Sequence, residues 1–124
     1  MLDLLHIENI AIIEQADIAF RPGFNALTGE TGAGKSIVID ALSAVLGQRA
    51  SRELIRTGAD HAFVSAVFSH IPEGLGEDLG VADAQEWLLQ REIYTDGKNV
   101  CRCNGRPMTV TQLRTLGSRL LNIH

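Results

Sequence analysis

The sequence predicts an α/β fold in which an apolar helix follows a glycine-rich loop and the other strands form an antiparallel β lobe. Three observations lead to this prediction. A short apolar strand, residues 24–29, runs into the glycine-rich stretch LTGETGAGKS. Residues 35–47 are apolar around nearly the whole circumference of a helix, which is typical of a buried helix. Later in the chain, Asp96–Gly97 separates two arms of strand-like sequence, which predicts a β-hairpin.

Composition and charge restrict the class of protein. The chain has 124 residues, of which 45% are hydrophobic and 21% charged, as expected for one small globular domain or a part of a larger one. No apolar run reaches the roughly 18 residues that a membrane helix needs. The first residues, MLDLLHIENI, lack the features of a secretory signal, so we expect a cytoplasmic protein with no membrane partner. A net charge of −4 argues against a module that mainly binds nucleic acid, although a local patch could contact DNA.

The N-terminal residues predict two strands and a turn ahead of the loop. Residues 2–20 alternate loosely between apolar and polar side chains, and we place the bend between the two strands near Glu8–Asn9. Residues 21–23, Arg-Pro-Gly, predict a turn, because proline fixes φ and glycine permits a positive φ. The apolar helix is predicted to begin at Lys35 and to end at Gly47, a residue suited to the position just past a helix.

The second half of the chain predicts shorter elements. In order, we expect a serine-capped short helix at 51–56, a strand at 62–68, a loop with one helical turn at 70–84, and hairpin arms at 88–95 and 99–104. Cys101 and Cys103 lie two apart on the second arm, so both point to one face, and we interpret them as reduced structural cysteines. Thr109 and Gln112 form a capping-box pattern at the start of an amphipathic helix.

The glycine-rich stretch fits the P-loop motif G-x-x-x-x-G-K-[ST], which binds the phosphates of a nucleotide. Glycine leaves the backbone N–H groups open to phosphate oxygens, and the helix that follows adds the positive end of its dipole. Lys35 is predicted to neutralise the β- and γ-phosphates, and Ser36 to ligate Mg²⁺, so ATP and Mg²⁺ are the expected cofactors. The predicted binding residues are Gly29, Glu30, Thr31, Gly32, Ala33, Gly34, Lys35 and Ser36.

A P-loop gives nucleotide binding, but hydrolysis also needs a metal-binding carboxylate and a residue that positions water. The run Ile37–Asp40 mimics the strand that ends in such an aspartate, but it lies on the predicted helix and is rejected for that reason. No other apolar run ends in aspartate. We therefore expect no complete catalytic set in this chain, with Lys35 supplying only phosphate charge stabilisation.

Three arginines after the apolar helix have two interpretations. Arg49, Arg52 and Arg56 fall at i, i+3 and i+7, near one face of the short helix predicted there. They either contact phosphate, of a nucleotide or of the DNA backbone, or form a solvated and ion-paired surface. The sequence leaves both interpretations open.

The motifs together resemble a known group of ATPases. The opening LHIENIAIIE and the stretch FRPGFNALTGETGAGKSIVIDAL resemble the ABC-type ATPase heads of the SMC, Rad50, RecF and RecN group. Many SMC relatives have Pro-Asn where this chain has Glu30–Thr31. That pair, the segment from GQRAS to LIRTGAD, and the closing LLNIH are most similar to the RecN family of bacterial DNA repair proteins.

The resemblance implies that residues 1–124 are the N-terminal half of an ABC-type head, truncated before the Q-loop and the coiled coil. It implies an ATPase that acts in DNA double-strand-break repair and recombination, associated with the nucleoid in the cytoplasm. The implied partners are the C-terminal half of the same head, a second head in an ATP-dependent homodimer, and DNA through the full-length protein. On its own, this chain is expected to bind ATP without efficient turnover.

Three alternatives remain. The first is the head of another SMC, Rad50 or RecF-type ATPase. The second is a small-molecule kinase with the same P-loop, which predicts an arginine-rich lid and full activity from one compact chain. The third is a DNA-binding scaffold in which nucleotide only holds a shape, and it predicts DNA binding that is unaffected by Lys35→Ala.

Overall fold

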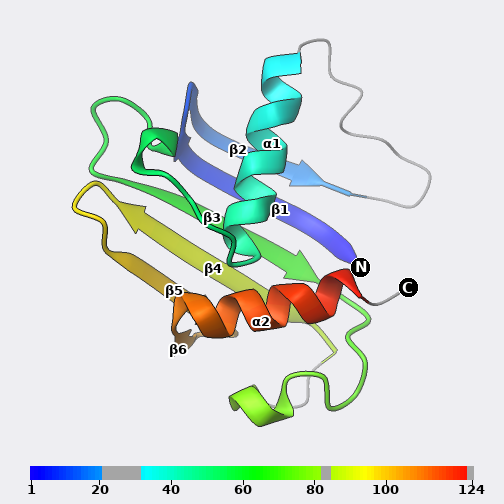
Figure 1. Cartoon of the computed structure of the whole chain (residues 1–124). Helices are drawn as coiled ribbons and strands as arrows, with labels where there is room; N and C mark the ends of the chain where they lie inside the picture. The colour runs from blue at the N-terminus through cyan, green and yellow to red at the C-terminus, as the bar shows by residue number, and fades with distance from the viewer. Residues whose placement is uncertain (21–31, 82–84, 123–124) are drawn as a thin grey trace.

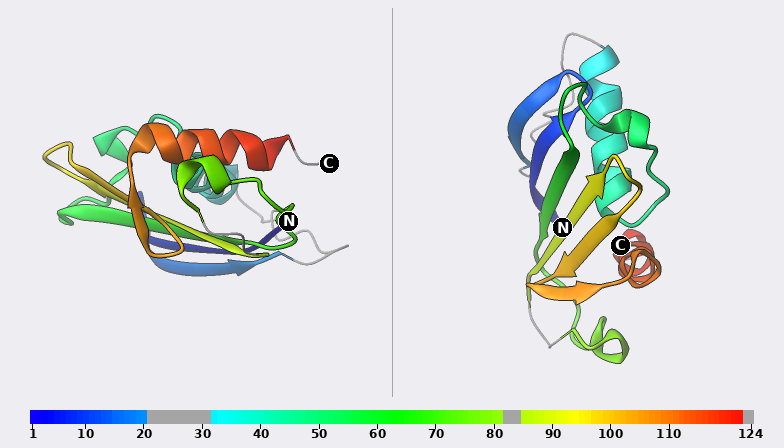
Figure 2. Two further views of the ribbon diagram at one scale, coloured as in Figure 1. Left: turned by 90° about the horizontal axis from the view of Figure 1, so that it is seen from below. Right: turned by 90° about the vertical axis from the view of Figure 1, so that its left-hand side faces the viewer.

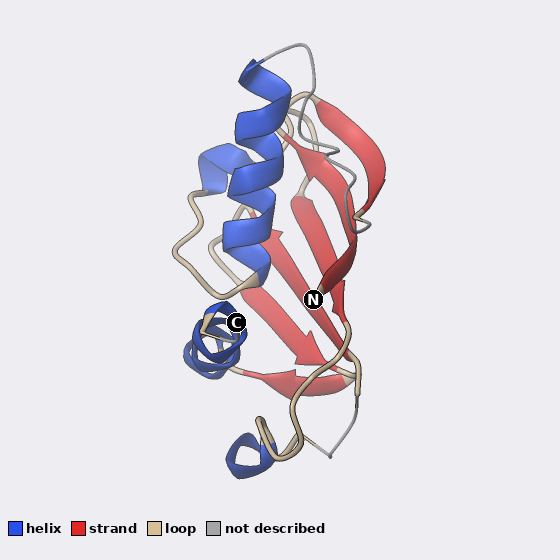
Figure 3. Ribbon diagram, turned by 90° about the vertical axis from the view of Figure 1, so that its right-hand side faces the viewer, coloured by secondary structure: helices blue, strands red, loops and turns tan. Residues whose placement is uncertain are grey.

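A computed structural model describes residues 1–20, 32–81 and 85–122. The described strands form one antiparallel sheet in the order β2-β1-β3-β4-β5-β6 (Figure 1). These strands are β1 (Leu2–Ile10), β2 (Ile13–Ala19), β3 (His61–Phe68), β4 (Trp87–Tyr94), β5 (Asn99–Cys103) and β6 (Arg106–Met108). The helices are α1 (Gly32–Val45) and α2 (Val110–Leu121), with short 3₁₀ helices η1 (Arg52–Leu54) and η2 (Glu77–Leu79). Both α-helices cover the same face of the sheet (Figures 2 and 3). The predicted α/β fold with an antiparallel lobe is confirmed.

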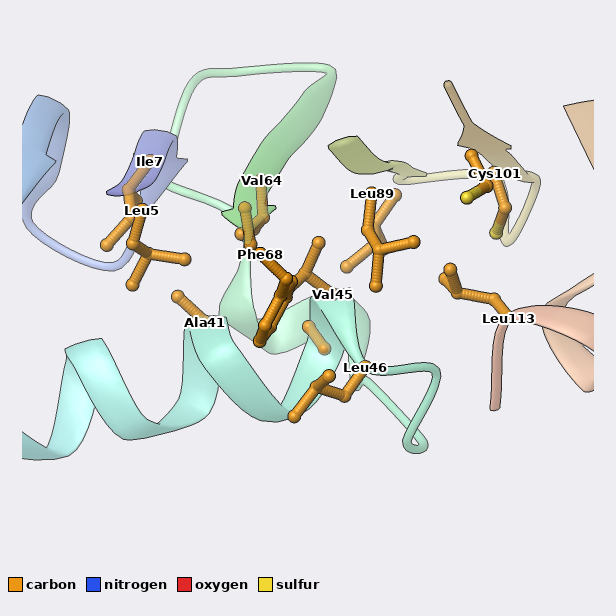
Figure 4. Packing of buried hydrophobic residues seen from close by; sticks show 14 of the residues in the cluster. Leu5, Ile7, Ala41, Val45, Leu46, Val64, Phe68, Leu89, Cys101 and Leu113 are labelled. Atoms are coloured by element: carbon orange, nitrogen blue, oxygen red, sulfur yellow. The ribbon is translucent and has the colours of Figure 1, made fainter. Parts of the chain in front are cut away.

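Alternation along the strands places the core between the sheet and α1. Every second residue of β3 and β4 is buried, because successive side chains of a strand point to opposite faces. Val64 and Leu89 are fully buried and lie on the face that α1 covers, where Val45 of the helix is also fully buried (Figure 4). At about 25 cal/mol per Å² of apolar surface, this burial is the main term that stabilises the fold.

The apolar helix is buried on one side only. Ala41, Ala44 and Val45 face the sheet and are at most 1% exposed, whereas Ile39 is 47% exposed. The prediction of a helix buried all round is therefore wrong for these residues, because only one face of the helix meets the single described sheet. The helix also begins at Gly32 rather than Lys35. Glycine has a low helix propensity, but the favourable helix that follows these glycines is sufficient to include them in its first turn.

The turn between β1 and β2 differs from the prediction. Ile10 pairs directly with Ile13, so the chain reverses at residues 11–12 and not near Glu8–Asn9. Ala11 takes a positive φ of 51° in this tight turn. The register buries Ile10 completely, which explains why the first strand continues past the polar pair that suggested a bend.

The hairpin and the capped helix follow the predictions closely. The arms at 88–95 and 99–104 correspond to β4 and β5 within one residue at each end. The Thr109 hydroxyl accepts a hydrogen bond from the N–H of Gln112, whose side chain accepts one from the N–H of Thr109, so the capping box is confirmed. Strand β6 was not predicted, although Asn104 and Gly105 both have positive φ and form the tight Asn-Gly turn that leads into it.

In its described residues, the segment between β3 and β4 contains one short helix, η2, as the sequence predicted. Arg119 of α2 holds this segment by donating two hydrogen bonds to the Asp78 carboxylate, at 2.6 and 2.8 Å. A third bond runs from Arg119 to the Leu75 carbonyl oxygen at 2.8 Å. Among the described residues, no helix has both the length and the apolar character that crossing a bilayer requires.

Candidate functional site

The described part of the candidate nucleotide site is the first turn of α1. Lys35 and Ser36 lie in this turn with exposed side chains, while Gly32 and Ala33 belong to its helical backbone. The turn contains no acidic residue. A lysine near the positive end of a helix dipole is unfavourable unless an anion is present, so this arrangement suits a bound phosphate. Three predicted residues, Gly29, Glu30 and Thr31, lie outside the described residues.

The run Ile37–Asp40 lies on α1, as predicted, and not on a strand that ends in a metal-binding aspartate. Ile37 faces the core, whereas Asp40 is exposed. Because Asp40 follows Ser36 by one helical turn, it lies further along the helix from the end that the phosphates are predicted to occupy. Asp40 is therefore not assigned as a carboxylate that holds a catalytic metal.

The C-terminal end of α1 is held by an arginine that sequence reasoning missed. The Arg91 guanidinium, only 3% exposed, donates from Nη1 to the carbonyl oxygens of Ala44 at 2.8 Å and Gln48 at 2.6 Å. Its Nε donates to Asn99 Oδ1 at 3.0 Å across the β4–β5 hairpin. The guanidinium therefore links the last turn of α1 to two strands of the sheet.

A second arginine reaches the same helix end from α2. Arg114 donates from Nε to the Gly47 carbonyl oxygen at 3.1 Å. Burial lowers the pKa of Arg91 from its ordinary range, and the nearby positive charge of Arg114 lowers it further. Two cations thus lie at one helix end despite their repulsion, because the carbonyl groups there give that end a negative partial charge.

The sequence did carry a signal for Arg91. On the inward-facing positions of β4, the arginine stands between Leu89 and Ile93, both at most 1% exposed. A charged residue at an inward position of an alternating strand is seldom buried unless it is paired, so its presence indicates a specific partner. The identity of that partner depended on the packing of α1, which local patterns do not determine.

The three arginines after α1 do not share a helix face, so that prediction is wrong. Only Arg52 lies in a helix, the three-residue η1, because Ile55 returns to extended backbone and ends it. Arg52 donates to the Thr95 carbonyl oxygen at 3.1 Å and so anchors η1 to the hairpin. Arg56 follows the end of η1, where its backbone N–H donates to the Asn9 carbonyl oxygen at 2.8 Å.

Arg49 precedes η1 and lines an open cavity of about 440 Å³. The cavity lies between α1, η1 and the β1–β2 turn, and its lining is of mixed charge: Ala11, Asp40, Ser43, Arg49, Ala50, Ser51, Glu53 and Leu54. Arg49 thus lies beside a space with room for a ligand. The phosphate-contact interpretation stays a prediction for all three arginines.

The cysteines and histidines do not form a metal site in the described parts of the chain. Cys101 and Cys103 are free thiols, both buried on one face of β5, as predicted. Burial raises the pKa of Cys103 to about 11, which makes it a poor nucleophile and a poor metal ligand.

One histidine on the opposite face of the sheet has two acidic neighbours. His6 Nδ1 lies 2.6 Å from Asp17 Oδ1, and its Nε2 lies 2.6 Å from Glu8 Oε2. The hydrogen bond with Glu8 raises the pKa of His6, with Asp17 adding to the effect and burial opposing it. With both ring nitrogens engaged, His6 links β1 to β2 and is not available as a ligand.

A family model described as "AAA domain" matches residues 4–99 of this chain. The chain is 43% identical to the DNA repair protein RecN of Bacillus subtilis and 42% identical to that of Vibrio cholerae. All of the chain is covered in both cases, but it spans only 22% and 23% of those relatives.

Solved SMC structures share the fold. One, from work on ATP-driven dimerization and DNA-stimulated activation of SMC ATPases, superposes with a TM-score of 0.76 at 28% identity, covering 97% of this chain and 79% of that one. The Smc head domain with a coiled coil and joint from Pyrococcus yayanosii gives 0.73 at 27% identity, with 95% and 25% covered. The fold is that of the N-terminal half of an SMC-type ATPase head.

Proposed function

This chain belongs to the AAA domain family, and from that premise we propose that it is the ATP-binding, N-terminal half of a RecN-like ATPase head. The whole protein would hydrolyse ATP and act in DNA double-strand-break repair and recombination in the bacterial cytoplasm. The similarity to RecN relatives and to SMC heads favours this function over a small-molecule kinase.

One observation carries the proposal. The first turn of α1 presents the exposed Lys35 and Ser36 and contains no acidic residue that would neutralise the helix end. A cation, a hydroxyl and the positive end of a helix dipole converge there, which are the groups that a magnesium-bound triphosphate requires. The residues present therefore fit both ATP and Mg²⁺.

In this proposal each residue of the turn has a separate role. The Lys35 ammonium neutralises negative charge on the β- and γ-phosphates, and the Ser36 hydroxyl is a ligand for Mg²⁺. Bound Mg²⁺ supplies charge neutralisation between the phosphates. The backbone of residues 29–34 is proposed to cradle the β-phosphate, as the P-loop motif predicts.

The rest of the catalytic site is proposed to come from partners. The C-terminal half of the same head would supply the metal-binding carboxylate, and a second head would close over the nucleotide in an ATP-dependent homodimer. Contacts to the γ-phosphate would favour the closed state, and hydrolysis would release it. DNA would be bound through the full-length protein.

An ATP titration of the chain with Mg²⁺ tests the proposal. Lys35→Ala is expected to weaken ATP binding about tenfold or more, because a hydrogen bond to a charged group contributes roughly 1.5–3 kcal/mol. The chain has two lysines, so Lys98→Ala, in the β4–β5 turn, is the matched control and should bind ATP like the wild type. Equal ATP affinity in Lys35→Ala and the wild type would contradict the proposal.

A further inference from the structure

We propose that Arg91 is a positioning residue for the nucleotide site at the opposite end of α1, an inference that rests on the proposed function. Arg91 contacts the last turn of the helix, whereas Lys35 and Ser36 lie in its first turn. The two ends are joined by one helix of 14 residues, about 20 Å long. The orientation of the helix at one end therefore determines where the first turn lies.

At its C-terminal end the helix has local backbone caps, such as the Gly47 N–H that donates to the Ala44 carbonyl oxygen at 3.0 Å, but no side-chain anchor of its own. Its last turn contains no basic residue. The side chains that bind carbonyl oxygens at this end come from other elements: Arg91 of β4 binds those of Ala44 and Gln48, and Arg114 of α2 binds that of Gly47, just past the helix. Asn99 on β5 fixes the guanidinium of Arg91 in turn, by accepting a hydrogen bond from its Nε at 3.0 Å. The chain of contacts thus runs from the sheet to the helix.

Stability alone does not explain a charged residue at this position. Arg91 is 3% exposed, and it makes no ion pair with any described residue. Burying a charge is costly, and apolar residues of similar volume often serve stability as well or better. What a planar guanidinium adds is direction: Nη1 donates to the carbonyl oxygens of Ala44 and Gln48, while Nε, fixed in the same plane, donates to Asn99.

The contact with α2 restricts the same helix end from a second side. A Cβ added at Gly117 would lie 2.2 Å from the Leu46 carbonyl oxygen, so the backbones of the two helices touch there. With Arg91 on the sheet side and α2 on the other, the C-terminal end of α1 has little freedom to translate. Loss of Arg91 would then be expressed mainly as a tilt of the helix.

A small tilt has a large effect at the far end. Over about 20 Å, a rotation of about 5° moves the first turn by about 2 Å. Functional groups need to be held within about 0.5 Å of their productive positions. Release of the anchor is therefore expected to weaken phosphate binding without removing any group that touches the nucleotide.

Titration of three variants with ATP and Mg²⁺, under conditions where circular dichroism shows each to be folded, tests the proposal. Arg91→Met should bind ATP about tenfold more weakly, and Arg91→Lys, which keeps the charge but not the fork, should recover part of that loss. Arg102→Met is the matched control, because Arg102 lies on the other face of the hairpin and pairs with Glu92 at 3.7 Å. Folded Arg91→Met with wild-type affinity would overturn the proposal.

Two further measurements keep the test decisive. If Arg91→Met does not fold, Asn99→Ala leaves the guanidinium in place but removes its support, and unchanged ATP affinity in that variant would overturn the proposal. If the wild type binds no ATP, the proposed function fails. The positioning of the first turn of α1 by Arg91 is then tested in the nucleotide-free chain. Backbone amide NMR shifts of residues 35–38 should then change in Arg91→Lys but not in Arg102→Met, and unchanged shifts would refute the role.

Discussion

Replacing Gly117 by alanine is expected to destabilise the protein, although alanine is the better helix former. In an exposed helix the change would gain about 1 kcal/mol. Here the new Cβ would lie 2.2 Å from the Leu46 carbonyl oxygen and 2.9 Å from its carbon. Contacts between carbon and oxygen are normally about 3.3 Å or longer, so α1 and α2 must separate by about 1 Å. Overpacking typically costs about 1–3 kcal/mol, and a clash between two backbones belongs at the upper end of this range. After the gain of about 1 kcal/mol in helix propensity is subtracted, the net loss of stability is about 2 kcal/mol.

Urea unfolding followed by circular dichroism measures this effect. For a chain of this size, a loss of about 2 kcal/mol lowers the urea midpoint by about 1 M. Ser118→Ala is the control, because Ser118 is exposed on the next position of α2 and should gain a few tenths of a kcal/mol from helix propensity. A Gly117→Ala midpoint equal to or above that of the wild type would refute the close backbone contact.

Two further predictions concern titratable groups. The hydrogen bond with Glu8 raises the pKa of His6 above 6.5, so its contribution to stability is complete below about pH 6.5 and is lost as the pH rises through the raised value. The difference in urea midpoint between wild type and His6→Gln should therefore be larger at about pH 5.5 than at about pH 8.5, and an equal or reversed difference would contradict the assignment. Burial raises the pKa of Cys103 from 9.0 to about 11, which reduces its thiolate about a hundredfold, so alkylation should be slow until urea unfolds the chain. Rapid labelling of both cysteines in the folded chain would contradict their burial.

Local rules account for the parts of the fold that were predicted correctly. The β4–β5 hairpin follows from Asp96–Gly97, and the start of α2 follows from the capping box of Thr109 and Gln112, because both signals act within a few residues. The β1–β2 turn was misplaced because loose alternation fits more than one register. Pairing of Ile10 with Ile13 is selected by which side chains the sheet buries, and that depends on the whole core.

The candidate site likewise has one part that local sequence predicts and another that it does not. The motif around Lys35 and Ser36 is contiguous in sequence, so spacing alone predicts it, and α1 carries both residues in its first turn. The groups that hold the other end of α1 come from residues much further along the chain. Arg91 binds Gln48 across a separation of 43 residues, and Arg114 binds Gly47 across a separation of 67. No local pattern encodes such contacts, because they exist only once α1 and α2 have packed on the sheet.

The central claim is that this chain binds ATP at the first turn of α1 but holds only half of a hydrolytic site. The most direct test is ADP release by the 124-residue chain saturated with ATP and Mg²⁺. We expect bound ATP and no steady turnover above that of Lys35→Ala, because no residue assigned here supplies the metal-binding carboxylate or positions water. Steady turnover by the wild-type chain that is abolished in Lys35→Ala would contradict the claim and identify a self-sufficient P-loop enzyme.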